Sequence, residues 1–208
     1  MTQRPAIAQH WRPAVGIAVV LALVATLLFI PRGDQNPRVQ DLPEDLLGEP
    51  DLHMRDALIT QFTARGTMKY QLASRRIRHF ESDELTRLTA PNLSLYSTSQ
   101  PPWQVSSDHG YIRQSRAQRP PTEVVFLREN VQLKQEYDDG RHIRLNSPAL
   151  YLYPDRQYAE TDQDVIIETN VGRTKAVGLE GDLQSGLLNL FSSSEQRVHT
   201  IVLPNQFK

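Results

Sequence analysis

The residues that could perform chemistry are scattered along the chain instead of forming a motif. Six histidines stand at positions 10, 53, 79, 109, 142 and 199, and no pair has metal-ligand spacing, so we predict no metal and no cofactor. The best local pair is Asp108–His109 in "SDHG", which a polar turn explains equally well. Ser106–Ser107 and Ser192–Ser194 lack the context of a nucleophile elbow. These residues predict no catalytic site and favour a binding or structural protein.

Four other polar segments could in principle carry a function. "GRTKAVGLEG" has the wrong glycine spacing for a phosphate loop, and no helix follows it. The basic run "RQSRAQR", residues 113–119, is typical of a solvated loop but could meet an anionic headgroup. An enzyme acting on envelope carbohydrate would need two close carboxylates in a cleft. The dense acidic groups, Asp138–Asp139 and Glu160–Asp162–Asp164, are instead typical of turns.

Composition narrows the class of protein further. The 208 residues suit one domain with an appendage, and the absence of cysteine excludes disulfides, thiolate zinc sites and thiol catalysis. A formal net charge of −1 gives no electrostatic argument for nucleic acid, so we predict no nucleic-acid partner.

One uninterrupted apolar run, "AVGIAVVLALVATLLFI", covers residues 14–30. As a helix it would be about 26 Å long, short but sufficient to span a bilayer. A cleaved signal peptide is the alternative, but bulky Leu28, Phe29 and Ile30 stand where a peptidase requires small residues. We predict a cytoplasmic tail at 1–13, a single-pass inner-membrane anchor at 14–30 and a Pro-rich acidic linker at 31–55. A β-domain at 56–204, outside the inner membrane, and a tail at 205–208 would follow.

From Asp56 onwards, short β-prone segments alternate with turn residues, which is the pattern of an all-β domain. We predict turns at Arg65–Gly66, Glu129–Asn130, Asn146–Pro148 and Pro154–Asp155. The segments "YQLASRRIRHF", "WQVSSDHGYIR", "IRLNSPALYLY" and "KAVGLEGDLQS" resemble one unit with a small residue or Gly near its centre. Repeated pairs of strands imply that each unit stacks its apolar face against the next unit. We therefore predict a twisted antiparallel β-structure, either a slab or a jelly roll.

One face of these strands is rich in apolar side chains that could pack a core or shelter acyl chains. The candidates for this lipid-binding interior are Leu72, Leu88, Leu93, Leu95, Trp103, Val105, Val125, Leu127, Val131, Leu150, Leu152, Ile166, Leu188 and Leu190.

Anchor, acidic linker and strand repeat together resemble the lipopolysaccharide export component C (LptC) family, the bitopic inner-membrane partners of the lipopolysaccharide transporter. The resemblance spans nearly the whole chain. It is carried by "DALITQFTARGTMKYQLASRRIRHFESDELTRLTAPNLSLY", "PPWQVSSDHGYI" and "GLEGDLQSGLLNL". It implies a β-jelly roll and a non-enzymatic periplasmic role. The protein would accept lipopolysaccharide from an inner-membrane ABC transporter and pass it to a soluble periplasmic bridge protein of the same fold.

The resemblance also implies how partners dock. Exposed edge strands pair readily with another chain. The first strand would meet the transporter's periplasmic domain, and the last, in "RVHTIVLP", would meet the bridge protein. Gly178 and Gly181 would form a turn that positions the last unit. The alternative function is an anchored scaffold that organises envelope partners without binding lipid. The predicted edge residues are Leu58, Ile59 and Phe62 at one end and Val198, Thr200, Ile201 and Val202 at the other.

Overall fold

The computed structural model describes residues 48–115 and 122–204; the predicted anchor at 14–30 and the tail at 205–208 lie outside these ranges. Every described residue belongs to the second of two compact units, residues 38–208. Within the described ranges no helix is long and apolar enough to cross a membrane. The strands are β1 (Leu52–Phe62), β2 (Met68–Phe80), β3 (Leu85–Thr89), β4 (Asn92–Leu95), β5 (Trp103–Ser106), β6 (His109–Ser115), β7 (Thr122–Glu136), β8 (His142–Tyr153), β9 (Tyr158–Thr169), β10 (Gly172–Asp182), β11 (Leu187–Leu190) and β12 (His199–Val202).

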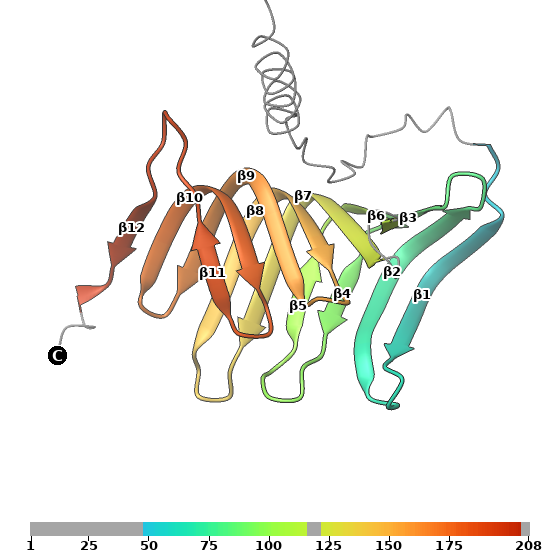
Figure 1. Cartoon of the computed structure of the whole chain (residues 1–208), viewed down its shortest axis with the longest axis horizontal. Helices are drawn as coiled ribbons and strands as arrows, with labels where there is room; N and C mark the ends of the chain where they lie inside the picture. The colour runs from blue at the N-terminus through green and yellow to red at the C-terminus, as the bar shows by residue number, and fades with distance from the viewer. Residues whose placement is uncertain (1–47, 116–121, 205–208) are drawn as a thin grey trace, which may run out of the picture. The chain divides into compact units, whose positions relative to one another are not determined.

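All twelve strands belong to one antiparallel sheet (Figure 1). β2 pairs with β4 along its first half and with β3 along its second half. In the same way, β7 pairs with β6 along its first half and with β5 along its second half. From β7 the sheet continues through β8, β9 and β10. At the opposite edge of the sheet, β1 pairs with β2. Two separate routes, β3–β6 and β4–β5, therefore connect β2 to β7.

A line of bends crosses the strands between these two routes. Glu129 and Asn130 in β7 and Gly178 in β10 have left-handed φ angles. The pairing register shifts beside these residues, as expected of β-bulges, which bend a strand and increase its twist. Small residues also mark the bends in the other repeat segments. The hydroxyls of Ser74, Ser107 and Ser147 each donate to the carbonyl two residues further along.

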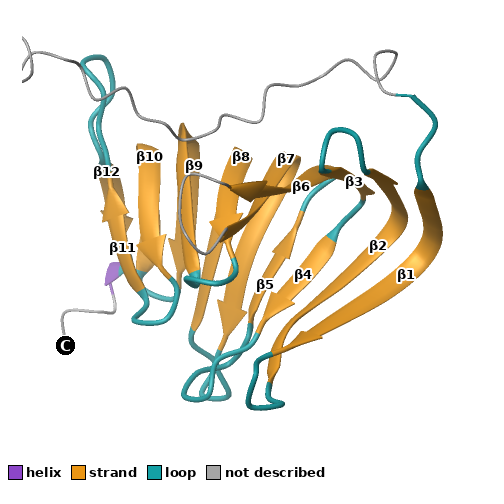
Figure 2. Ribbon diagram, turned by 45° about the vertical axis from the view of Figure 1, so that its right-hand side comes forward, coloured by secondary structure: helices purple, strands orange, loops and turns teal. Residues whose placement is uncertain are grey.

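These bends explain the repeat seen in the sequence. Ser74, Ser107, Ser147 and Gly178 are the small residues of the four predicted segments. The sheet folds back on itself along them, and its two halves face each other (Figure 2). We call the halves layer A and layer B. Layer A comprises β4, β5, β12 and residues 68–74, 131–136, 142–146, 164–169 and 172–177. Layer B comprises β3, β6, β11 and residues 76–80, 122–128, 149–153, 158–161 and 179–182.

The prediction of an all-β antiparallel jelly roll is confirmed, and the turns at Arg65–Gly66 and Pro154–Asp155 are present. The turns predicted at Glu129–Asn130 and Asn146–Pro148 are wrong, because β7 and β8 pass through them as bent but continuous strands. Residues that tolerate left-handed φ mark bulges as well as turns. β1 also begins at Leu52, so residues 52–55 of the predicted linker are strand.

Ser74 offers a test of how much a bend hydroxyl stabilises the fold. Its buried Oγ lies within hydrogen-bond distance of the carbonyls of Arg76 (2.9 Å) and Thr89 (2.8 Å), which belong to neighbouring strands. Ser74→Ala should lower the free energy of unfolding by about 1 kcal/mol, the typical contribution of one such bond. Urea unfolding would measure it, with Ser82→Ala in an exposed turn as control. Equal unfolding midpoints for the two variants would contradict the prediction.

Candidate functional site

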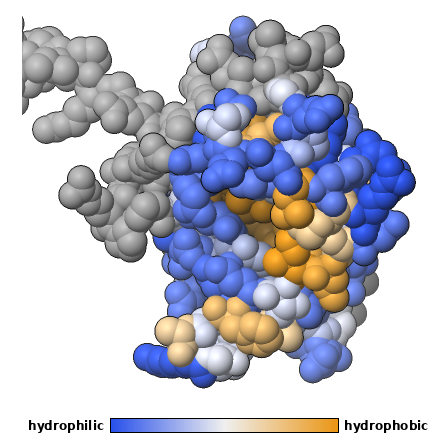
Figure 3. All heavy atoms as spheres, turned by 90° about the vertical axis from the view of Figure 1, so that its right-hand side faces the viewer, coloured by the Kyte–Doolittle hydropathy of each residue, from blue (hydrophilic) through white to orange (hydrophobic). Residues whose placement is uncertain are grey.

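A pocket of about 760 Å³ opens at the β1 end of the folded sheet. Figure 3, which views the molecule from this side, shows an apolar hollow surrounded by hydrophilic side chains. The apolar lining consists of Leu52, Met54, Ile59, Leu72, Ile77 and Ile112, and the polar lining consists of Tyr70, His79, Glu81, Glu84, Thr86, Arg113, Gln114 and Glu123. The combination suits an amphipathic ligand with an apolar chain inside and a polar group at the mouth.

Polar contacts join the two layers at the pocket. The Tyr70 hydroxyl in layer A donates to Glu123 Oε1 in layer B at 2.8 Å. Beside them, Lys69 forms an ion pair with Asp155, which also accepts a 3.3 Å bond from the Glu123 backbone N–H. Burial raises the pKa of the Glu123 carboxyl above its ordinary value, against the opposing effect of the Tyr70 hydrogen bond. Burial and the neighbouring Glu123 likewise raise the pKa of Tyr70.

This raised pKa predicts a pH dependence of stability. Between the ordinary carboxyl pKa of 4.5 and its raised folded value, Glu123 binds more protons in the folded state than in the unfolded state. The free energy of unfolding therefore falls as pH rises through that window. Glu123→Gln, whose amide oxygen can still accept from Tyr70, should remove this dependence. Wild type should thus gain stability relative to the variant as pH is lowered from 7 towards 4.5.

Urea unfolding at several pH values would measure the difference between the two proteins. Glu195→Gln, on an exposed loop, is the control. Parallel curves for wild type and Glu123→Gln would show that this carboxyl does not titrate differently on folding.

The structure gathers almost all of the predicted interior residues into one cluster between the layers. Leu188 and Leu190 pack against its edge half-buried. Ile166 is the exception: Val165 and Ile167 point into the cluster, so Ile166 lies on the other face of β9. The predicted residues that are buried within the cluster are Leu72, Leu88, Leu93, Leu95, Trp103, Val105, Val125, Leu127, Val131, Leu150 and Leu152.

Further contacts between the layers close the fold beyond the pocket. The Trp103 indole N–H donates to the Leu183 carbonyl at 2.9 Å, and the Gln157 amide donates to the Tyr96 carbonyl at 2.9 Å. Leu150 and Leu152 between the layers have no solvent exposure. Beyond the pocket, therefore, the interior is a packed core in this conformation. A chain entering from the pocket would have to part the two layers to go deeper.

The predicted edge residues lie at opposite sides of the sheet. Leu58, Ile59 and Phe62 belong to β1, which among the described strands pairs only with β2. Leu58 and Phe62 are among the most exposed large apolar side chains. At the other side, Thr200, Ile201 and Val202 lie in β12, and Val198 directly precedes it. Within the part of the chain that the structure describes, β12 pairs with β10 alone.

The prediction that Gly178 and Gly181 form a turn is wrong, because both lie within β10. Gly178 has φ +93° and is the bulge of that strand. At Gly181 a Cβ would come 2.8 Å from Leu188 Cδ2, so a side chain there would press on β11. Gly178 therefore bends β10, and Gly181 allows β11 to lie close to it.

The structure gives structural roles to the catalytic candidates. Asp108 Oδ2 accepts from the Asn130 amide at 2.6 Å, and His109 Nε2 lies 3.7 Å from the Glu129 carboxylate. Ser107 bonds a backbone carbonyl, and Ser193 accepts from backbone N–H groups of its own turn. Among the described residues, no group of three or more His, Asp or Glu could hold a metal ion.

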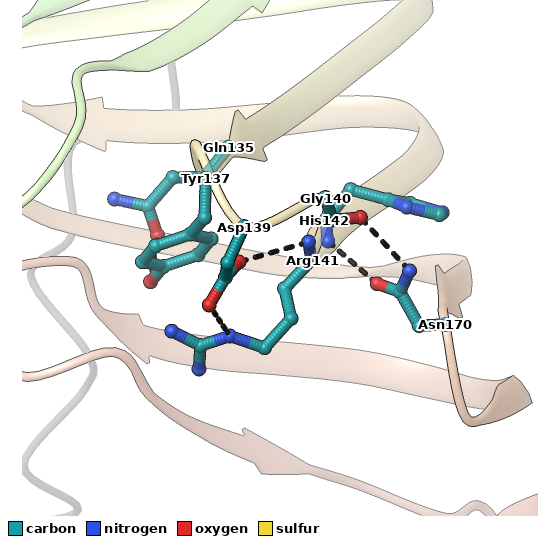
Figure 4. Close-up of polar contacts among 7 residues, drawn as sticks. All are labelled: Gln135, Tyr137, Asp139, Gly140, Arg141, His142 and Asn170. Atoms are coloured by element: carbon teal, nitrogen blue, oxygen red, sulfur yellow. Dashed lines mark hydrogen bonds and ion pairs between the residues drawn. The ribbon is translucent and has the colours of Figure 1, made fainter.

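The acidic pair Asp138–Asp139 lies in the β7–β8 turn, and Figure 4 shows the contacts of Asp139. Asp139 accepts from the backbone N–H of Arg141 and from its guanidinium, at 3.0 and 2.6 Å, and these bonds lower the pKa of Asp139. Asn170 then ties this turn to the β9–β10 turn by donating to the Gly140 carbonyl and accepting from the His142 N–H. These contacts assign the turn a structural role. The turn predicted for the other acidic group is wrong, because Glu160, Asp162 and Asp164 lie within strand β9.

Sequence reasoning missed the contacts between the layers. Tyr70 and Glu123 are 53 positions apart, and Trp103 and Leu183 are 80 apart. Tyr70 stands two residues before Leu72 on the same inward face, which is the one local signal that could have placed it at the pocket.

The folded sheet with an apolar interior matches a known class of protein. It is similar to the crystal structure of LptH from Pseudomonas aeruginosa, described as the LptA-homologous periplasmic component of the lipopolysaccharide transport device. The TM-score is 0.50 at 8% identity, over 65% of this chain and 95% of that one. This likeness shows that the fold is a β-jelly roll like that of LptH. No curated protein sequence matches significantly.

The sequence family gives the more specific result. Residues 17–198 match the family described as "Lipopolysaccharide-assembly, LptC-related". The match covers most of the chain, and the chain belongs to the LptC family. Its role therefore lies in lipopolysaccharide transport.

Proposed function

We propose that this protein accepts the acyl portion of lipopolysaccharide at the β1 end and passes it between its layers towards β10 and β11. The observation that carries the proposal is the pocket, whose apolar lining continues into the core cluster. Burying an acyl chain there is favourable, by about 0.8 kcal/mol per methylene group. The polar lining leaves a phosphate-bearing or sugar headgroup at the water-exposed mouth.

The partners follow from the family and from the two sheet edges. Residues 14–30 anchor the chain in the inner membrane beside an ABC transporter, with the domain in the periplasm. β1 pairs with the transporter's periplasmic β-domain, and the edge formed by β10 to β12 receives a soluble bridge protein of the same fold. Backbone pairing at exposed edges is a common means of strand addition.

Site-specific photocrosslinking tests the proposal. A photoreactive amino acid at Met54 probes the pocket, and one at Leu188 probes the far end of the interior. Their neighbours Arg55 and Asn189 are exposed and serve as matched controls. We expect lipopolysaccharide adducts at Met54 and Leu188 in transporter-containing membranes. Those at Leu188 should require ATP.

Adducts at neither interior position, in a protein still assembled with the transporter, would contradict the proposal. That result would favour the alternative function, an anchored scaffold that organises envelope partners without binding lipid. Equal labelling at Arg55 and Met54 would also count against the proposal, because it would show lipid on the surface instead of in the pocket.

A further inference from the structure

Two short strands cover the outer edge of β10. β11 pairs with residues 179–182, and β12 pairs with residues 172–175 after an intervening exposed loop. β10 itself has eleven residues and lies beside β9, which has twelve. Without β12, residues 172–175 of β10 would be free to pair with another strand.

The two covering strands differ in how they are held. Leu188 and Leu190 of β11 pack against the core, whereas all four residues of β12 are exposed. The apolar residues of this segment, Ile201 at 56% and Val202 at 46% exposure, bury little surface. β12 is therefore held mainly by its backbone ladder, with a 3.0 Å hydroxyl contact between Thr174 and Thr200. The net gain from such bonds is small and is offset by the entropy of ordering the strand.

The family comparison separates β12 from the rest of the sheet. The match to the LptC family ends at Val198, one residue before β12 begins. β11 lies inside the matched region, and β12 lies outside it. The strand that contributes nothing to the core is thus also the one beyond the family pattern.

β12 is also a poor electrostatic match for the edge it covers. Arg173 and Lys175 are exposed on the outer face of β10. Arg173 already has a carboxylate across the β9–β10 pair, Glu168 at 3.5 Å, whereas β12 places His199 opposite Lys175. A carboxylate directly across an antiparallel pair would stabilise the Lys175 cation. The edge of β10 therefore suits a strand with an acidic residue at that position better than it suits β12.

We propose that β12 is a removable cover and that the docking strand of the next protein replaces it on β10. The partner is an antiparallel edge strand of another β-slab, with an acidic side chain opposite Lys175. The inference rests on the proposed function, because the soluble bridge protein supplies that strand. The sequence predicts that the bridge protein docks on β12. In this proposal β12 instead covers the edge of β10 until the strand of the bridge protein displaces it.

Locking β12 in place tests the replacement. The chain has no cysteine, so Thr174→Cys with Thr200→Cys can form one disulfide across the β10–β12 pair, where the two hydroxyls already lie 3.0 Å apart. Lys134→Cys with Arg144→Cys, a cross-strand pair of β7 and β8, is the control lock. Affinity for the purified soluble bridge protein of the same bacterium is measured for oxidised and reduced forms of both. Oxidation of the β12 lock should weaken binding at least about tenfold, reversibly, and oxidation of the control should not.

Two further variants remove the cover instead. Deleting residues 192–208 removes β12 but keeps Phe191, whose carbonyl accepts from Val177. Gly172→Ala would place a Cβ 2.1 Å from the Ile201 carbonyl oxygen and so displace β12. Both should bind about tenfold more tightly, and adding Lys175→Glu to the deletion should reverse the gain.

The outcomes separate the two proposals. Equal binding by the locked and reduced forms would overturn the replacement and leave the partnership intact, with the bridge protein adding outside β12. No binding by any form, including the deletion, would overturn both the replacement and the handover to a bridge protein.

Discussion

Joining Lys69→Cys to Asp155→Cys with a short bis-maleimide should hold lipid at the pocket and prevent its passage through the protein. These positions form the ion pair that connects layer A to layer B beside the Tyr70–Glu123 bond. The interior beyond them is packed, with Leu150 and Leu152 fully buried. A lipid chain can therefore advance only if the two layers separate. The bis-maleimide cross-link prevents that separation at the mouth of the pocket.

The measurement uses the photoreactive positions at the two ends of the interior. In the linked protein, lipopolysaccharide adducts at Met54 should persist, and those at Leu188 should fall by about tenfold or more, which corresponds to at least 1.4 kcal/mol against passage. The unlinked double variant controls for loss of the ion pair. Undiminished labelling at Leu188 in the linked protein would show that lipid reaches β11 without separation of the layers at this point.

Trp103→Ala should produce the largest loss of stability among single substitutions in the domain. Trp103 is 3% exposed within the core, and its indole N–H bonds the Leu183 carbonyl across the layers. Truncating a buried tryptophan to alanine costs about 3–5 kcal/mol through lost burial and the cavity left behind. Urea unfolding followed by far-ultraviolet circular dichroism would measure the change.

A second variant separates packing from the hydrogen bond. Trp103→Phe retains most of the apolar volume but leaves the Leu183 carbonyl without this donor, so we expect a smaller loss of about 1–3 kcal/mol. A loss below about 1 kcal/mol for Trp103→Ala would contradict the role of this side chain in holding the layers together.

The repeated strand segments show what a local sequence pattern can predict and what it cannot. Its small residues were visible in the sequence, and the structure places Ser74, Ser107, Ser147 and Gly178 at bends. The pattern did not distinguish a bend from a reversal of the chain, because a bulge and a turn favour the same residue types. β7 pairs with β8 on both sides of Glu129–Asn130, and this pairing shows that the site is a bend in a continuous strand.

Ile166 illustrates a second limit of local pattern. Alternation assigned the faces of β7 correctly, since Val125, Leu127 and Val131 are all buried. In "DVIIET" three successive residues are apolar, so period-two alternation cannot choose a face. In the structure, the side chains of Val165 and Ile167 are the ones that pack in the core between the layers.

The sequence by itself determined the all-β class, the antiparallel strands, most of the inward side chains and the family, because alternation and turn chemistry act over a few residues. Only the tertiary structure decided the pocket, the Tyr70–Glu123 and Trp103–Leu183 contacts and the covering of β10 by β12. The pocket and the two contacts depend on how the sheet folds back along its bends, and the position of β12 depends on backbone pairing across a loop. That folding brings together residues tens of positions apart, whose local sequences carry no sign of their partners.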